Sequence, residues 1–263
     1  DFSARIHQCA PRHVETVGTS ALRKASNSPE FIAEVKRRTG LDIRVIPGEA
    51  EARLTLLGVS RALRDAQSGK KDFFSSALII DIGGGSTEVI ITHPGVDPVV
   101  VSLPLGAVYL TERFIHHDPP SGEELALLRR SVREELEVHA QLHPRPSYVF
   151  VGTAGTITTL AAMYQGLAEY DSARINRTVL TREFIDDIVL KLGALTIEQR
   201  RAIRGLDPGR EDIILAGAIV TQEIMEHFHY VSMLVSDWGL REGIVFDLYE
   251  KIIKGSATKS PRH

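Results

Sequence analysis

The stretch LIIDIGGGSTE, residues Leu78 to Glu88, decides the fold of this 263-residue chain. It opens on three consecutive apolar residues, a pattern typical of a strand buried on both faces, and this strand delivers Asp81 to a sharp turn. The glycines that follow allow positive φ and close backbone approach, so successive N–H groups, assisted by hydroxyl donors, can face one anion. The sequence therefore predicts a phosphate-binding turn made by Gly83, Gly84, Gly85, Ser86 and Thr87.

The segment after the turn, Thr87 to Thr92, resumes an extended apolar pattern, so the turn joins two strands of a hairpin. A Walker loop or a dinucleotide-binding loop would instead open a helix, and the Walker loop would also need a Lys-Ser or Lys-Thr pair. The alternative is a glycine-rich hairpin turn that binds nothing. The flanking acidic residues, Asp81 and Glu88, favour the phosphate-binding interpretation.

The composition is that of an ordinary globular protein, with 43% hydrophobic and 25% charged residues. The net charge of −3 is spread over interspersed acidic and basic residues, which argues against nucleic acid or an anionic membrane as a partner. Cys9 is the only cysteine, so an intramolecular disulfide is excluded. Because no apolar run could cross a bilayer and no signal segment opens the chain, we expect a soluble, cytoplasmic protein of two domains.

The N-terminal part is typical of a β-α-β unit. A weakly alternating strand from His13 to Thr19 runs into a helix that carries Arg23, a second helix stops at Gly40, and Leu41 to Val45 alternate as a strand. Arg23 has two interpretations, a guanidinium directed at a phosphate or a solvated helix charge, and the pattern alone favours the second.

A helix from Glu49 to about Gln67 follows, with Glu49 and Glu51 in its first turn. Acidic side chains in that position complement the helix dipole, and the pattern alone favours this role. The alternative is that one of the two glutamates is a general base. The polar, turn-rich residues from Ser68 to Ser76 predict a domain boundary.

The middle of the chain offers one further candidate site. His116, His117 and Asp118 could be imagined as metal ligands, but adjacent histidines seldom point the same way and the prolines that follow mark a surface connection. We therefore expect no metal there. Ser121 and Glu124 predict a capping box that begins a long amphipathic helix.

A second buried strand, Tyr148 to Val151, runs into another small glycine-bearing loop before a helix. Two such loops predict the two walls of one phosphate or nucleotide cleft, the alternative being close strand-helix packing. The candidate binding residues of the second loop are Gly152, Thr153, Gly155 and Thr156.

The C-terminal part predicts a mobile connection from Glu169 to Arg177 and helices from Thr181 to Gly193 and from Thr196 to Arg204. Val231 to Val235 should be the last strand. A closing helix extends to about residue 253, and residues 257–263 should be disordered.

Five motifs make the chain resemble the exopolyphosphatase and guanosine pentaphosphate phosphohydrolase family over nearly its whole length. They are TSALR at 19–23, PGEAEARL at 47–54, DIGGGSTE at 81–88, GTAGTITTLAA at 152–162 and SDWGLREG at 236–243. The glycine turn alone is shared with the wider actin-like ATPase and sugar kinase superfamily. The resemblance implies an α/β fold of two ribonuclease-H-like domains, an active site in the cleft between them, and magnesium-dependent hydrolysis of a terminal phosphoanhydride.

The resemblance also implies roles for the matching residues. Glu51 would orient and deprotonate the attacking water, which replaces the dipole interpretation given above. Asp81 would hold magnesium, and Glu88 matches a second acidic position of the metal region. The N–H groups of Gly83 to Ser86 would bind phosphoryl oxygens, and the loop at 152–156 would close the far wall. The candidates for neutralising charge on the transferred group are Arg23 and Arg241.

Two features of the family have no counterpart here: an opening β-hairpin with a D-x-G-S/T-N-S loop, and the additional helical domain of the long polyphosphatases. The chain opens at Asp1, after the point where the hairpin would lie. We therefore expect a short-form enzyme whose first domain lacks its N-terminal strands and whose activity is incomplete. The predicted domains are residues 1–74, completed by a closing helix at 241–256, and residues 75–240.

The expected function is hydrolysis that removes terminal phosphate from inorganic polyphosphate, guanosine pentaphosphate or both, with Mg²⁺ as cofactor. One alternative is a kinase-like ATPase, which an acceptor-dependent ATP turnover would indicate. Another is a polyphosphate or alarmone sensor that binds these ligands without hydrolysing them. The oligomeric state is left open, with a homodimer as one option.

Overall fold

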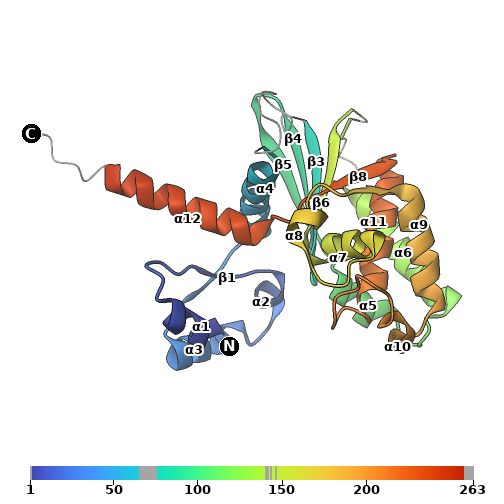
Figure 1. Ribbon diagram of the computed structural model, residues 1–263, viewed down its shortest axis with the longest axis horizontal. Coiled ribbons are helices and arrows are strands. Elements are labelled where there is room, and N and C mark those ends of the chain that lie inside the picture. Colours follow the sequence, from blue (N-terminus) through green and yellow to red (C-terminus); the bar gives the residue numbers. More distant parts are fainter. Residues whose placement is uncertain (1, 65–75, 140–141, 143, 146, 258–263) are drawn as a thin grey trace, which may run out of the picture.

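The computed structural model describes residues 2–64, 76–139, 142, 144, 145 and 147–257 (Figure 1). The predicted α/β class is confirmed: helices surround a six-stranded mixed sheet, and a two-stranded parallel sheet stands apart from it. Most of the predicted boundary segment at 68–76 and all but residue 257 of the predicted disordered tail lie outside the described residues. The domain limits stay a prediction.

The larger sheet has the strand order β5-β4-β3-β6-β8-β7. The predicted hairpin is confirmed, because β3 and β4 are antiparallel and β5 adds to β4, whereas β6 and β8 continue the sheet in parallel with β3. The edge strand β7, antiparallel to β8, was not predicted. The strands are β3 (Ala77–Ile82), β4 (Thr87–His93), β5 (Val96–Leu103), β6 (Val149–Thr153), β7 (Val179–Thr181) and β8 (Ser232–Val235).

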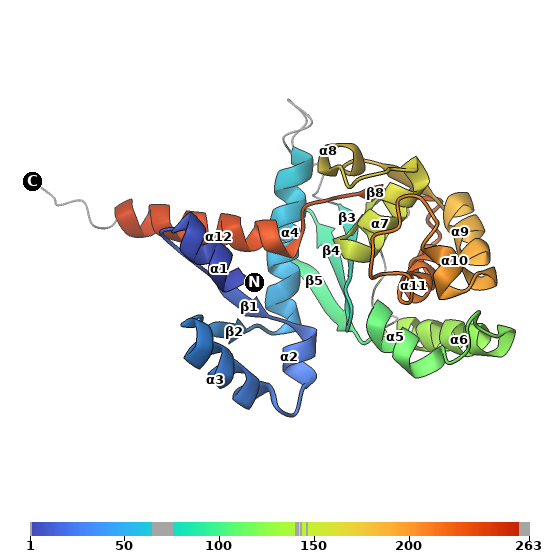
Figure 2. The ribbon, with the colours of Figure 1, turned by 60° about the horizontal axis from the view of Figure 1, so that its bottom comes forward.

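Both faces of this sheet are covered by helices, which is why residues 77–80 of β3 are all apolar and all buried. Leu78 and Ile80 pack into the large core with the helices of one face, whereas Ala77 and Ile79 pack on α4 at the other. The first face carries α5 (Ala107–Phe114), α6 (Gly122–Val138), α7 (Ala154–Gln165), α9 (Arg182–Ala194) and α11 (Ile214–His227). Helix α4 (Gly48–Arg64) is in turn crossed by α12 (Leu240–Ala257), which projects away from the sheet (Figures 1 and 2).

The predicted N-terminal β-α-β unit is confirmed. Strands β1 and β2 are parallel, with two helices between them in sequence, and an additional first helix was not predicted. The unit lies beside α4, on the side of the molecule away from α9 and α11 (Figure 2). Its elements are α1 (Phe2–Cys9), β1 (Thr16–Gly18), α2 (Ser20–Lys24), α3 (Ser28–Thr39) and β2 (Ile43–Val45).

Three predictions for the C-terminal half of the chain are wrong in detail. No loop separates β6 from α7: the strand ends at Thr153, and the helix begins at Ala154. The predicted helix from Thr196 to Arg204 is only α10 (Ile197–Arg200), followed by turns. The predicted connection from Glu169 to Arg177 contains the short helix α8 (Ser172–Ile175), because the Asp171 carboxylate accepts hydrogen bonds from two N–H groups of its first turn.

The predicted capping box of α6 is present in full. The N–H of Glu124 donates to Ser121 Oγ (3.2 Å), and the Glu124 carboxylate accepts from the N–H of Ser121 (2.8 Å) and contacts His117 Nδ1 (2.9 Å). Asp118 caps α10 at the N–H of Ile197 (2.8 Å). His117 and Asp118, two of the three residues considered as metal ligands, thus take part in helix caps. Among the described residues, no three His, Cys, Asp or Glu side chains are grouped to hold a metal.

Glu124 should make folding stability depend on acid pH. The N–H of Ser121, then the His117 ring, lower the pKa of Glu124 from 4.5 to about 2. Because the folded-state pKa is depressed, the stabilisation is complete above the unfolded pKa and is lost as pH falls toward 2. Urea denaturation from pH 6 to pH 2 should show that Glu124→Gln is less stable at neutral pH and loses less stability in acid. Identical pH slopes for the variant and the parent would contradict this role.

Candidate active site

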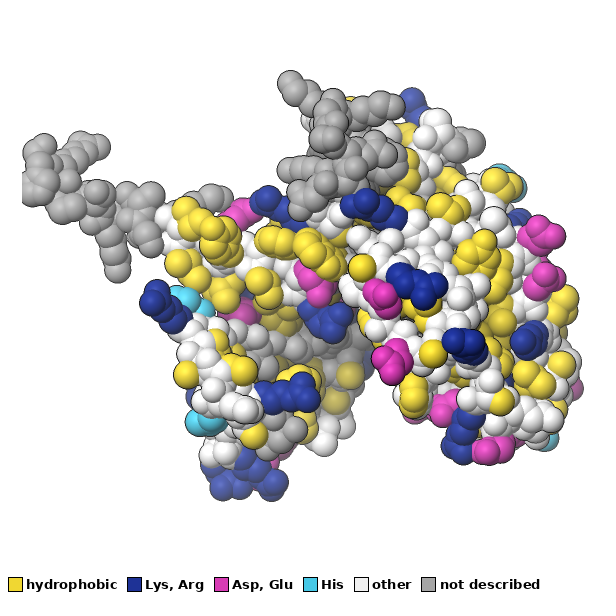
Figure 3. Space-filling view, viewed as in Figure 1, with side chains coloured by type: hydrophobic (Ala, Val, Ile, Leu, Met, Phe, Trp, Pro, Cys, Tyr) yellow, Lys and Arg dark blue, Asp and Glu magenta, His cyan; other side chains and the backbone are white. Residues whose placement is uncertain are grey.

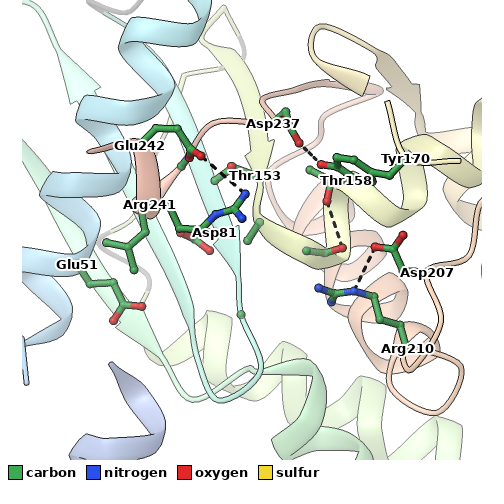
Figure 4. Close-up of a pocket in the computed structure, with 15 residues that line it drawn as sticks. Glu51, Asp81, Thr153, Thr158, Tyr170, Asp207, Arg210, Asp237, Arg241 and Glu242 are labelled. Carbon is green, nitrogen blue, oxygen red and sulfur yellow. Dashed lines mark hydrogen bonds and ion pairs between the residues drawn. The ribbon is translucent and has the colours of Figure 1, made fainter. Parts of the chain in front are cut away.

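The first turn of α4 and the carboxyl end of β3 meet at a cavity of about 480 Å³ (Figure 4). Glu51 enters it from α4 and Asp81 from β3, and both carboxylates are largely buried. Glu49, the other glutamate of the turn, is exposed and pairs with Arg53 (3.1 Å). The cavity is lined by Glu51, Asp81, Gly83, Thr153, Ala154, Gly155, Thr158, Tyr170, Asp207, Arg210, Asp237, Gly239, Leu240, Arg241 and Glu242.

Asp81 is held from α4 by a residue that the sequence did not single out. Thr55 lies one helical turn after Glu51 and donates its Oγ1 proton to Asp81 Oδ2 (2.9 Å), and its side chain is fully buried. Burial, opposed by this hydrogen bond and assisted by the nearby charge of Glu51, raises the pKa of Asp81 to about 6. One helix therefore supplies both Glu51 and the group that orients Asp81.

Glu88 lies directly across the hairpin from Asp81 but does not line the cavity. Its Oε1 accepts from the hydroxyls of Ser86 (2.9 Å) and Ser102 (2.7 Å). Burial raises the pKa of Glu88 to about 7, with further contributions from the charges of Glu51 and Asp81. The three carboxylates thus repel one another electrostatically in a buried place, an arrangement that a cation would relieve.

Arg23 contacts the carboxylates and not the cavity. Its Nη1 donates to Glu51 Oε2 (2.7 Å) and to the carbonyl of Ile46 (2.8 Å), while its Nη2 lies 3.9 Å from Glu88 Oε1. The interpretation as a solvated helix charge is therefore wrong. In this structure Arg23 fixes the carboxylate of Glu51, so the predicted contact with a phosphoryl group stays a prediction.

The glycine turn packs closely against the start of α5. The carbonyls of Gly83 and Gly84 accept from the first N–H groups of α5, and a Cβ at Gly106 would lie 2.2 Å from the Gly84 oxygen. The N–H of Gly83 donates to the carbonyl of Ser86 (3.0 Å), which removes it from the predicted cradle. The N–H groups of Gly84, Gly85 and Ser86 have no acceptor among the described residues.

The hydroxyl of Thr87, which was predicted to help bind phosphate, has a structural role instead. It is fully buried and donates to the carbonyl of Leu105 (2.7 Å). Ser86 is likewise buried and engaged with Glu88. Side-chain donors of the turn thus stabilise the hairpin, and only its backbone is left for an anion.

Two of the four residues of the second predicted wall lie at the cavity, and their role in binding phosphate stays a prediction. Thr153 and Gly155 line the cavity, whereas Gly152 and Thr156 do not. A Cβ at Gly152 would lie 2.4 Å from Met233 Sδ, and Thr156 is buried against Gly217, so these two residues serve packing. Between them, Ala154 has a φ of 70°, a left-handed conformation that is uncommon for a residue with a side chain, and it also lines the cavity.

Six polar cavity residues were not predicted as site residues: Thr158 and Glu242 lie on helices, and the other four come from turns far along the chain. Asp207 and Arg210 pair with each other (3.5 Å), and Thr159 donates to Asp207 Oδ2 (3.1 Å). A Cβ at Gly155 would lie 2.2 Å from Arg210 Nη2, so glycine is what lets this guanidinium reach the wall. Tyr170 and Asp237 form a hydrogen bond above Asp207 in the view of Figure 4. Their turn-rich surroundings gave no signal of this convergence.

Arg241 lines the cavity at the start of α12, as its candidate role requires. Its side chain is 83% exposed, and its nearest described carboxylate oxygen is Glu242 Oε1 at 3.7 Å. Glu242 in turn accepts from the N–H of Gly239 (2.9 Å). A cation that is this exposed and loosely paired is available to an incoming anion.

The donor set fits a hard divalent cation. Asp81 and Glu88 offer carboxylate oxygens from adjacent strands, and magnesium usually needs one or two carboxylates, with water and substrate phosphate completing its shell. Sites built in this way need no third protein ligand, in keeping with the absence of a three-residue metal group among the described residues. Asp81, which lines the cavity, is the better-placed ligand.

Comparison with known proteins gives consistent matches. Residues 1–252 match the sequence profile of the Ppx/GppA phosphatase family. Exopolyphosphatase 2 of Mycobacterium tuberculosis is 34% identical over 247 residues, covering 89% of this chain and 74% of that protein. The crystal structure of the Aquifex aeolicus member of the Ppx/GppA family has a TM-score of 0.78 at 33% identity, covering 95% of this chain and 78% of that chain. An exopolyphosphatase-like protein solved by structural genomics has a TM-score of 0.84 at 30% identity, covering 95% of this chain and 82% of that chain.

In the part of the chain that the structure describes, no helix is both long enough and apolar enough to span a membrane.

Proposed function

Because this chain is a member of the Ppx/GppA phosphatase family, we propose that it removes the terminal phosphate of inorganic polyphosphate by hydrolysis. The single observation that carries the proposal is the placement of Glu51. Its carboxylate lines a polar cavity that Arg210 and Arg241 also line, with Arg210 on the far side (Figure 4), and Arg23 fixes one of its oxygens. The names of the exopolyphosphatase relatives support polyphosphate as the substrate.

In the proposed reaction Glu51 is the general base. With Oε2 bound to Arg23, its other oxygen can accept the proton of a water in the cavity and orient that water toward the terminal phosphorus. The bond between phosphorus and the attacking oxygen forms as the bridging P–O bond breaks, and the shortened chain leaves with that bridging oxygen. Arg241, and Arg210 on the far wall, would neutralise the phosphoryl oxygens.

Magnesium would be held by Asp81, with Glu88 beside it, and would neutralise phosphate charge when bound. Thr55 keeps the Asp81 carboxylate in one orientation from the same helix that carries Glu51. Guanosine pentaphosphate is proposed as a second substrate, because its terminal phosphoanhydride presents the same group to the cavity.

The test is phosphate release from polyphosphate and from guanosine pentaphosphate, with and without magnesium. We expect release from polyphosphate that stops when EDTA removes divalent cations and returns when magnesium is added in excess. Turnover unaffected by EDTA would remove magnesium from the proposal. Binding of both ligands without release would favour the sensor, and ATP turnover that depends on an added acceptor would favour the kinase-like ATPase.

A further inference from the structure

Two positively charged side chains contact the ring of Tyr109 of α5, next to the glycine turn. Lys24 of α2 places its Nζ 5.2 Å from the centre of the tyrosine ring, and the guanidinium carbon of Arg113 lies 5.8 Å from the same centre. Arg113 Nη1 also donates to the Tyr109 hydroxyl (2.6 Å). Lys24 and Arg113, held on this ring, are called the cation pair below.

The cation pair has no acidic partner in the part of the chain that the structure describes. Exposed cations such as Lys36, Arg61 and Lys251 lie beside a carboxylate. Neither Lys24 nor Arg113 forms an ion pair with any described residue. Contacts with an aromatic face hold the two charges in place without cancelling them. Two neighbouring like charges without counter-charges destabilise each other, so an anion would be bound favourably there.

The cation pair is tied to the glycine turn. Lys24 Nζ donates to the carbonyl of Gly85 (3.0 Å), and the N–H of Tyr109 donates to the carbonyl of Gly84 (3.0 Å). Gly84 is exposed, and the N–H groups of Gly84 and Gly85 have no described acceptor. Two side-chain cations therefore lie next to the glycine turn, on the side that its carbonyls face, within a few residues of Asp81.

The geometry points to a second phosphate subsite, in which the cation pair binds phosphate groups of polyphosphate beyond the terminal one. This inference rests on the proposed function. The ring of Tyr109 is already in contact with two cations, so the cluster suits a polyanion and not a stacked nucleobase. A local subsite also explains how a chain with a net charge of −3 could hold a long polyanion.

Equilibrium binding tests the subsite without using turnover. Glu51→Gln protein would be titrated with polyphosphate of several tens of units and with tripolyphosphate, alone and combined with Lys24→Met or Arg113→Met. Each methionine keeps an apolar stem but removes the charge. We expect each variant to weaken long-chain binding by roughly three- to tenfold at low salt, by less at high salt, and to change tripolyphosphate binding much less.

Lys191→Met is the matched control, because Lys191 is an exposed lysine of α9 that has no described ion pair and lies on a different helix from the cation pair. It should leave both affinities unchanged, and thermal denaturation should show that all variants are folded. Unchanged long-chain affinity in the cation-pair variants would overturn the subsite, and so would equal weakening for both chain lengths. Absence of phosphate release by the parent protein would refute the proposed function separately, since the binding comparison does not depend on it.

Discussion

Replacing Glu51 with glutamine is expected to lower the rate of phosphate release by about a hundred- to ten-thousand-fold, the usual contribution of a general base. Glutamine keeps the size of the side chain and an oxygen that can accept from Arg23, but it cannot take a proton from water. Polyphosphate binding should therefore persist. Steady-state release of phosphate, together with equilibrium binding of polyphosphate, measures both quantities.

Glu49→Gln is the matched control, since Glu49 lies in the same helical turn and is also a first-turn acid. Its side chain is 67% exposed and its carboxylate pairs with Arg53 outside the cavity. This variant should retain the parent's turnover. Loss of turnover in Glu49→Gln with activity kept in Glu51→Gln would reverse the assignment of the base.

Replacing Gly243 with alanine is expected to destabilise the protein by about 3 kcal/mol, at the upper end of the cost of overpacking. The new Cβ would lie 1.8 Å from the carbonyl oxygen of Leu54, and a backbone atom inside a helix cannot move aside cheaply. At the same crossing, a Cβ at Gly58 of α4 would lie 2.0 Å from the carbonyl oxygen of Gly239. Because α4 carries Glu51 and the first turn of α12 carries Arg241, catalytic efficiency should fall as well.

The control for this prediction is Gly193→Ala in α9. A Cβ there would lie 3.4 Å from Leu125 Cδ1, an ordinary contact, and alanine favours a helix by up to about 1 kcal/mol over glycine. This variant should be as stable as the parent or slightly more stable. Chemical denaturation of both variants measures the change in the free energy of unfolding. Equal stability of Gly243→Ala and the parent would show that the crossing of α4 and α12 can relax.

The active-site hairpin could be predicted from the sequence because its signals are local. A continuous apolar run, three glycines and a second apolar run specify strand, turn and strand. The direct pairing of Asp81 with Glu88 was not predicted, because it depends on the register of the hairpin. The capping box of α6 was equally readable, since Ser121 and Glu124 satisfy each other's backbone within one turn. The limits of α10 could not be predicted, because tertiary packing overrides weak helix propensity.

The sequence by itself determined the order of the elements, the glycine turn and the acidic and basic residues that a phosphoryl-transfer site needs. Only the tertiary structure decided which of them meet. It separated Glu51 from Glu49, turned Arg23 toward a carboxylate, brought Thr55 to Asp81, and placed Asp207 and Arg210 on the far wall. The physical reason is that helical and strand periodicity act over a few residues, whereas these contacts depend on how α4, α12 and the sheet pack across long sequence separations.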